Sequence, residues 1–206
     1  MSEELFGQNV SRETYDKLRA YDALIQKWNP SINLVAKSTL SDVWNRHIID
    51  STQGYFAALD EKSSIWTDIG SGGGLPGIVI ATLAQGADRQ TNVTMVESDK
   101  RKSVFLRTAI RELGLSNAKV VNERIESAQI PVSNIVSARA LAPLTDLFTL
   151  SRGFADRNTT FLFQKGKNWA SEIEVAQNHW SFEYDAIKSK TDRNAVILKI
   201  RGLSRV

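Results

Sequence analysis

The stretch Asp68-Ile69-Gly70-Ser71-Gly72-Gly73-Gly74-Leu75-Pro76-Gly77 decides the fold of this chain. It follows a β-type run at residues 65–69 and opens a helical run at 76–85. Five glycines within residues 70–77 allow a tight turn off a strand and a close approach of a ligand to the backbone. A proline suits the first position of the helix that follows. The pattern therefore favours a ligand-binding strand–turn–helix unit over a glycine-rich turn without a ligand.

Short β-type runs and helical runs alternate after this loop. We expect strands at 65–69, 93–97, 119–122, 134–137, 160–164, 182–187 and 195–200, and helices at 76–85, 99–113, 143–155 and 169–180. Alternating strands and helices predict a doubly wound, mostly parallel sheet. Residues 188–194 are too few for a crossover helix, so the last two strands should form an antiparallel hairpin. In the helix at 99–113, Asp99 fits the N-cap and Gly114 the C-terminal stop.

Residues 1–62 are expected to form a helical N-terminal extension to the α/β domain at 63–206. Apolar residues at helical spacing predict a first helix from about residue 10 to 28, ended by Asn29-Pro30. Residues 39–42, Thr-Leu-Ser-Asp, have the spacing of a capping box with Asp in place of Glu. A second helix should therefore begin there and continue through Ile48.

Three polar side chains of this second helix have two interpretations. Arg46 and Asp50 lie four residues apart, so an ion pair on one helix face is the default. His47 is expected to be packed between apolar neighbours. The alternative is a direct role, in which this helix closes a ligand site on the adjacent domain.

Composition limits the class of protein. The 206 residues are 42% hydrophobic and 24% charged, which is typical of a globular chain. The chain has no Cys, which favours a reducing compartment and excludes Cys chemistry and Cys-bound zinc. No apolar run is long enough to span a bilayer, and the acidic opening does not resemble a signal peptide. We expect a cytoplasmic monomer without a metal.

The net charge of +3 hides an uneven distribution. Residues 100–124 carry seven Lys or Arg and two Asp or Glu, whereas residues 1–62 carry seven and nine. A concentrated excess of cations indicates either a nucleic-acid contact or a solvated helix face.

Two ligand classes suit the glycine-rich loop. Gly72, Gly74 and Gly77 satisfy G-x-G-x-x-G, and Glu97 follows twenty residues later at the end of the second strand, where a carboxylate binds ribose hydroxyls. This glycine pattern and this carboxylate suit NAD, but they suit any other ligand that contains adenosine equally well. Asp68 would repel a pyrophosphate and attract an amino-acid ammonium. The single domain and the terminal hairpin also favour S-adenosyl-L-methionine.

These residues closely resemble the RsmG (GidB) family of bacterial small-subunit ribosomal RNA methyltransferases. The loop at 68–78 carries the resemblance together with Arg46-His47-Ile48-Ile49-Asp50-Ser51. Further matches lie at 28–34, 97–107 and 137–140. The resemblance extends from about residue 28 to 199 and is loose before that. It implies a Rossmann-like class I methyltransferase that uses S-adenosyl-L-methionine to methylate N7 of one guanosine in 16S rRNA.

The resemblance also implies roles for particular residues. Gly70 and Leu75 belong to the cofactor loop, and Ile125 with Glu126 faces the adenine. Arg139 lines the active-site side and is the candidate catalytic residue, and it is also expected to contact the cofactor. The alternative for Arg139 is a structural arginine that pairs with a carboxylate.

The position of these residues in the expected sheet agrees with the resemblance. Ligands of open α/β sheets bind beyond the carboxyl ends of the strands. Gly70, Glu97, Glu126, Arg139 and Lys165 each fall at or just after such an end. We therefore expect them to converge on one site.

The reaction type can be narrowed by exclusion. Methylation of a pyrimidine at C5 usually needs a Cys nucleophile, which this chain lacks. Residues 137–141, Ser-Ala-Arg-Ala-Leu, do not resemble the N/D-P-P-aromatic motif of amino-nitrogen methylases. Guanine N7 has an exposed lone pair and needs no general base, so positioning could supply much of the catalysis. A methyltransferase for another RNA or a small molecule, or a non-catalytic nucleic-acid-binding protein, remains an alternative.

A basic stripe on the helix at 99–113 is the candidate RNA surface. Lys100, Arg107 and Arg111 lie on one face, opposite the apolar residues, with Arg101 beside them. With Lys165 and Lys167 they are expected to bind phosphates of 16S rRNA or of the small ribosomal subunit. A solvated helix face is the alternative.

Overall fold

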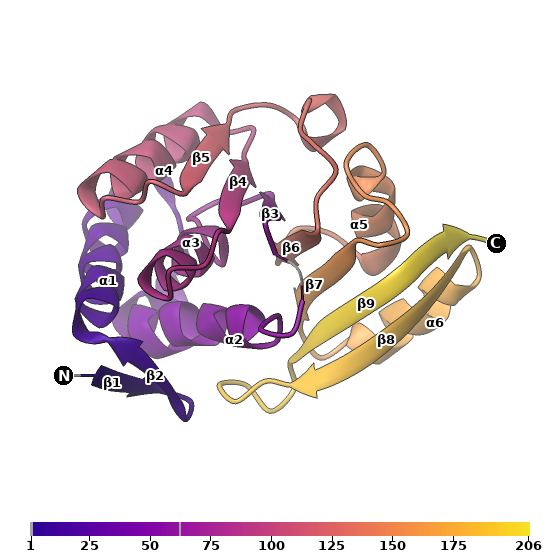
Figure 1. The fold of residues 1–206 in the computed structure, drawn as a ribbon, viewed down its shortest axis with the longest axis horizontal. Helices are drawn as coiled ribbons and strands as arrows, with labels where there is room; N and C mark the ends of the chain where they lie inside the picture. The colour runs from indigo at the N-terminus through magenta and orange to yellow at the C-terminus, as the bar shows by residue number, and fades with distance from the viewer. Residues whose placement is uncertain (1, 62) are drawn as a thin grey trace.

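A seven-stranded sheet runs through the centre of the chain. The computed structural model describes residues 2–61 and 63–206. The strands are β3 (Ile65–Ile69), β4 (Asn92–Val96), β5 (Ala118–Val121), β6 (Ile135–Arg139), β7 (Thr160–Lys165), β8 (Trp180–Lys188) and β9 (Val196–Arg205). Their order is β5-β4-β3-β6-β7-β9-β8 (Figure 1). Strands β3 to β7 pair in parallel, whereas β9 runs antiparallel to both β7 and β8. The predicted mostly parallel sheet with a terminal antiparallel hairpin is confirmed.

Helices cover both faces of this sheet. They are α1 (Arg12–Ile32), α2 (Asp50–Phe56), α3 (Gly77–Gly86), α4 (Lys100–Glu112), α5 (Leu144–Ser151) and α6 (Trp169–Gln177). Helices α1 to α4 group on one side, and α5 and α6 on the other (Figure 1). Helices α5 and α6 end earlier than expected, and α6 is followed directly by β8, which begins at Trp180.

The predicted ends of α4 are confirmed. The Asp99 side chain accepts hydrogen bonds from the backbone N–H groups of Arg101 and Lys102, as an N-cap should. Gly114 has φ +62° just after the last turn. Helix α4 therefore starts where the chain leaves the carboxyl end of β4, and its basic face begins beside that edge.

Alternation along the strands builds a core on each face of the sheet. In β7, Phe161 and Phe163 pack with α5 and α6, and Leu162 between them packs on the opposite face with α1 to α4. Leu18 and Ile25 of α1 belong to the same apolar cluster as Trp66 of β3. The N-terminal segment thus shares a core with the sheet.

The N-terminal segment is not wholly helical, contrary to expectation. It opens with a β-hairpin of β1 (Ser2–Leu5) and β2 (Gln8–Ser11). The prediction that Asn29-Pro30 ends the first helix is also wrong, because α1 continues to Ile32. Pro30 lacks one N–H donor in the last turn, but its fixed φ is compatible with helical backbone. The true stop is Asn33, at φ +47°, whose N–H bonds the Asn29 carbonyl.

The second predicted helix is broken into three parts. A 3-10 helix (η1, Lys37–Asp42) leads to a π-helical turn (η2, Trp44–Ile49), which continues directly into α2. The predicted capping box is wrong: the Thr39 hydroxyl donates to the Ala36 carbonyl, and Asp42 accepts from the backbone N–H of Asn45. Within residues 2–61 and 63–206, no helix combines the length and apolar character needed to cross a membrane.

Candidate functional site

The glycine-rich loop is held in place by Tyr21 of α1, which lies outside the loop in the sequence. Gly74 has φ +79°, and a Cβ there would lie 2.6 Å from the hydroxyl oxygen of Tyr21, so only glycine fits. Tyr21 is fully buried and donates a hydrogen bond from this hydroxyl to the carbonyl of Gly73. No local sequence pattern predicts this contact, because it joins residues that are 52 positions apart.

A cavity of about 440 Å³, the glycine-loop cavity, lies beyond the carboxyl ends of β3, β4 and β6. Its lining brings together five residues predicted for the ligand site: Gly70, Gly72, Glu97, Ile125 and Glu126. The remaining lining residues are Val96, Ser98, Lys102, Glu123, Arg124, Ala140, Leu141, Ala142 and Leu150. Sequence reasoning missed Lys102 and Arg124, although both neighbour predicted residues along the chain.

Glu97 links the loop to the start of α4. One carboxylate oxygen accepts from the Gly72 N–H at 2.7 Å, and the other accepts from the Asp99 N–H at 2.7 Å. The side chain of Asn122 donates to the Glu97 carbonyl at 2.8 Å. This buried carboxylate is therefore held rigidly at the cavity wall, with lone pairs left for further donors.

Asp68 and Leu75 do not line the cavity. Asp68 is fully buried beneath the loop, where the Ser137 hydroxyl donates to it at 2.7 Å. Burial raises the pKa of Asp68 to about 6, although hydrogen bonds from Ser137 and Ser71 oppose the shift. Leu75 packs in the apolar cluster under α1 to α4. The predicted direct contact of Asp68 with a ligand ammonium is not supported, because its carboxylate faces the protein interior.

A second cavity of about 270 Å³, the Arg139 cavity, lies beyond the carboxyl ends of β6 and β7. It is lined by Arg46, His47, Asp50, Arg139, Ala140, Gln164, Lys165 and Gly166, and by residues 189, 191–192 and 195–197. Ala140 lines both cavities and has φ +52°, a conformation that non-glycine residues rarely adopt. Strained backbone of this kind clusters at ligand sites. The two cavities therefore adjoin at one strained residue.

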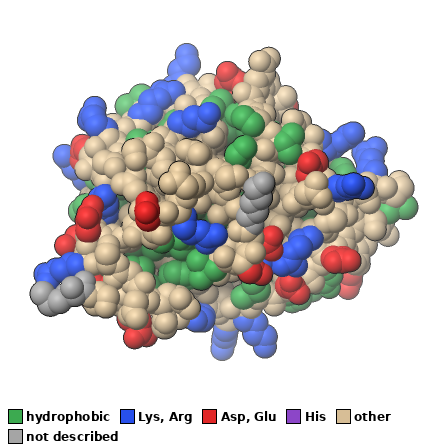
Figure 2. All heavy atoms as spheres, in the orientation of Figure 1, with side chains coloured by type: hydrophobic (Ala, Val, Ile, Leu, Met, Phe, Trp, Pro, Cys, Tyr) green, Lys and Arg blue, Asp and Glu red, His purple; other side chains and the backbone are tan. Residues whose placement is uncertain are grey.

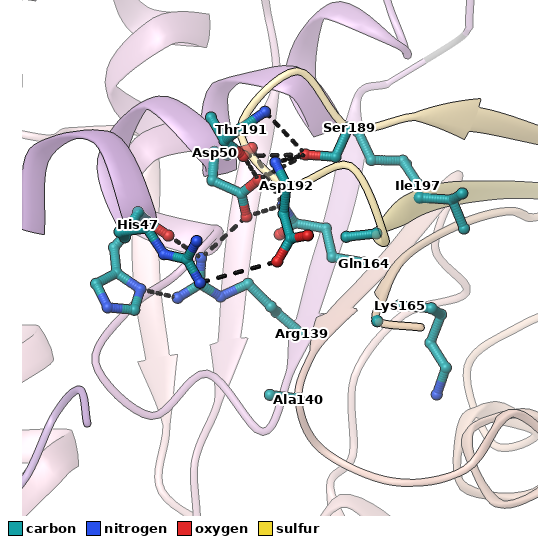
Figure 3. A pocket seen from close by; sticks show the side chains of 14 residues that line it. His47, Asp50, Arg139, Ala140, Gln164, Lys165, Ser189, Thr191, Asp192 and Ile197 are labelled. Carbon is teal, nitrogen blue, oxygen red and sulfur yellow. Dashed lines mark hydrogen bonds and ion pairs between the residues drawn. The ribbon is translucent and has the colours of Figure 1, made fainter. Parts of the chain in front are cut away.

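Arg139 is held by an acid and a histidine from the N-terminal segment (Figure 3). Its guanidinium lies 3.2 Å from the Asp50 carboxylate, and the side chains are only 16% and 18% exposed. The predicted Arg46–Asp50 ion pair is wrong. The π-helical turn and α2 direct Asp50 towards Arg139 at the end of β6, so Asp50 does not pair with Arg46. Arg46 instead lies 3.8 Å from Asp192. Arg139 thus pairs with a carboxylate and also lines a cavity.

His47 is neutral and has a defined tautomer. Its Nδ1 accepts from the Arg139 guanidinium, so the proton lies on Nε2, which donates to the Thr39 hydroxyl at 2.7 Å. Burial, followed by the charges of Arg139 and Arg46, lowers the pKa of His47 to about 4. The expectation of a packed histidine fits its burial, but its partner is a charged arginine.

Asp50 connects four segments of the chain. Besides Arg139, its carboxylate accepts from the Gln164 amide at 2.9 Å, the Ser189 hydroxyl at 3.3 Å and the Thr191 hydroxyl. Gln164 could have been predicted, because it ends β7 beside the other site residues. Ser189 and Thr191 could not, because they lie in a hairpin turn that has no motif.

The predicted basic residues separate into two groups. Five are exposed to solvent: Lys100, Arg101, Arg107, Arg111 and Lys167. Lys165 differs, because its side chain is only 9% exposed, lies 2.6 Å from Glu172 and donates to the Ala142 carbonyl. It points away from the Asp50 cluster in Figure 3. The predicted phosphate contact of Lys165 is therefore not supported, because its ammonium already has an internal partner.

Comparisons with known proteins agree with this geometry. The family model described as "rRNA small subunit methyltransferase G" matches residues 14–196. A "Ribosomal RNA small subunit methyltransferase G" of Ruegeria pomeroyi is 48% identical, with 96% of each chain covered. One of Cereibacter sphaeroides is 44% identical over 100% of both chains. A SAM-dependent methyltransferase structure from Aquifex aeolicus superposes with a TM-score of 0.60 at 11% identity, covering 87% of this chain and 97% of that one. That last likeness concerns the fold alone.

Proposed function

Because the chain belongs to the rRNA small subunit methyltransferase G family, we propose that it transfers the methyl group of S-adenosyl-L-methionine to N7 of a guanosine in 16S rRNA. The observation that carries this proposal is the pair of cavities that adjoin at Ala140. A methyl donor in one and a base in the other would meet beyond the carboxyl ends of the strands, where α/β sheets bind their ligands.

The glycine-loop cavity suits S-adenosyl-L-methionine. The fixed Glu97 carboxylate would accept hydrogen bonds from the ribose hydroxyls, as in other adenosine sites. Ile125 and Glu126 would lie beside the adenine, and the backbone at Gly70 and Gly72 beside the methionine portion. Bound there, this cofactor supplies an electrophilic methyl group on a sulfonium. Asp68 and Leu75 would support the loop from beneath rather than contact the cofactor.

The Arg139 cavity would hold the guanine. An extruded base presents N7 and O6 as acceptors on one edge. A guanidinium N–H of Arg139 could donate to O6 and leave the N7 lone pair free to attack the methyl carbon in line. No proton needs to be removed, so orientation and electrostatics would carry the catalysis. In this proposal Arg139 is the catalytic residue, and Asp50 and His47 position it.

We propose that RNA phosphates bind the exposed basic face of α4. Lys100, Arg101, Arg107 and Arg111 follow the N-terminus of this helix beside Glu97 and the cofactor, and Lys167 lies at the other side of the site. The substrate would be 16S rRNA or the small ribosomal subunit, bound by a monomer in the cytoplasm.

Two measurements test the proposal. Isothermal titration should show binding of S-adenosyl-L-methionine and none of NAD; tight binding of NAD alone would contradict the cofactor assignment. A mass or primer-extension map of rRNA from cells without the protein should lack one N7-methylguanosine of the small subunit. If every such mark persisted at full level, the rRNA assignment would be wrong.

A further inference from the structure

The turn between β8 and β9, residues 189–195, is fixed against α2. Asp50 accepts from the hydroxyls of Ser189 and Thr191. The side-chain oxygen of Gln53 accepts from the backbone N–H of Lys190 at 2.8 Å. This turn is anchored from the N-terminal segment, which makes it a preorganised element.

The anchored turn forms one wall of the Arg139 cavity. Ser189, Thr191, Asp192 and Ala195 line it, opposite Arg139. Arg193 lies between two of these lining residues and is exposed. Within residues 2–61 and 63–206 it makes no ion pair. An exposed cation without an ion pair among the described residues therefore lies in the turn that forms this wall.

The turn carries an excess of positive charge. Within residues 186–195 three exposed cations, Lys188, Lys190 and Arg193, stand against one carboxylate, Asp192, which already pairs with Arg46. Figure 2 shows Lys and Arg side chains projecting from the edge of the molecule where this turn lies. Lys190 is already partly engaged, since its ammonium lies 5.0 Å from the centre of the Phe6 ring. Arg193 is the freer charge.

We infer that the β8–β9 turn is a second RNA-binding element, in which Arg193 binds a backbone phosphate next to the guanosine held in the Arg139 cavity. The inference rests on the proposed function and goes beyond the α4 stripe. A base extruded into the cavity leaves its flanking phosphates at the mouth, where exposed guanidinium groups bind them well. RNA with an extruded guanosine fits because the turn offers exposed positive charge beside a cavity that could hold the base.

The test compares Arg193→Ala with Arg152→Ala, an equal loss of charge at the opposite end of β7. Arg152 is also exposed and without an ion pair among the described residues. Binding of a small-subunit rRNA fragment is measured at several salt concentrations. One lost phosphate contact should lower the slope of log K against log salt by about 0.7–0.9 and weaken binding by about five- to eightfold at 0.1 M salt. Arg193→Lys should recover most of the affinity, and Arg193→Glu should lose more.

Cofactor binding separates the possible outcomes. Titration with S-adenosyl-L-methionine should give the wild-type Kd for all four variants, because neither Arg193 nor Arg152 lines the glycine-loop cavity. If Arg193→Ala binds RNA with the wild-type Kd and slope, or if Arg152→Ala loses as much, the inference is wrong while the proposed function stands. If the wild-type protein binds the cofactor but no rRNA, both are wrong.

Discussion

Acidification should weaken folding through His47, because protonation would place a further positive charge beside Arg139 and Arg46. Burial and these two charges lower the pKa of His47 from 6.5 to about 4. In the unfolded chain the group titrates near 6.5. A pKa that is lower in the folded state adds stability above pH 6.5, and this stability is lost as the pH falls towards 4.

The size of the effect follows from the two pKa values. The full difference between 6.5 and about 4 corresponds to about 3 kcal/mol. At pH 5 about 2 kcal/mol of this would be lost relative to pH 7.5. Asp68 acts in the opposite direction: burial raises its pKa to about 6, so its contribution is present below 3.8 and is lost as the pH rises through 6. The pH profile of the wild-type protein therefore mixes two opposing groups.

Replacing His47 by Asn separates the pH-dependent contribution of His47 to stability from that of Asp68. The Asn side-chain oxygen can take the place of Nδ1 and accept from Arg139, but the amide does not titrate. Urea unfolding of both proteins between pH 7.5 and 5 measures the difference, and the Asp68 contribution cancels. We expect the wild-type protein to lose about 2 kcal/mol more than the variant over this range. Parallel pH profiles would refute the reasoning, since His47 would then titrate alike in the folded and unfolded states.

Three further substitutions test other parts of the site. Gly74→Ala should cost about 3 kcal/mol or more in urea unfolding, because the residue needs a positive φ and its Cβ would overlap the Tyr21 hydroxyl; a loss below 1 kcal/mol would contradict the loop geometry. Tyr21→Phe should lower the free energy of unfolding by about 1–2 kcal/mol in the same assay, because the Gly73 carbonyl loses its donor. An unchanged free energy of unfolding would show that this hydrogen bond does not stabilise the fold. Arg139→Ala should abolish transfer of a labelled methyl group to rRNA while the Kd for S-adenosyl-L-methionine, from titration, stays the same, because Arg139 does not line the glycine-loop cavity; full activity would exclude it from catalysis.

Local signals predicted much of the fold. The Asp99 cap and Gly114 stop depend on neighbouring backbone groups, so both ends of α4 could be predicted from a few residues. The antiparallel hairpin followed from chain length alone, because a seven-residue connection cannot hold a crossover helix. The convergence of Gly70 and Glu97 on one cavity followed from the rule that parallel strands end at one edge.

Contacts between distant segments were not predictable in the same way. Spacing suggested Arg46 as the partner of Asp50, but the partner is Arg139, 89 positions away. The π-helical turn that presents Asp50 to the sheet has no sequence signal among the helix rules. Lys165 ended a strand just as Arg139 did, yet Glu172 on α6 neutralises it. In each case the partner of the side chain is determined by tertiary packing, and local sequence patterns cannot distinguish it from the alternatives.

The hydrogen bond from Tyr21 to Gly73 limits how this protein can be divided or recombined. A fragment starting at residue 63 would keep all seven strands of the central sheet and the whole glycine-rich motif. It would nevertheless lose the donor that fixes the loop and the apolar surface of α1 that covers α3 and α4. A chimera that transplants the motif into another sheet must therefore carry α1 with it. The loop and α1 must therefore be transferred together, although Tyr21 and Gly73 lie more than fifty residues apart along the chain.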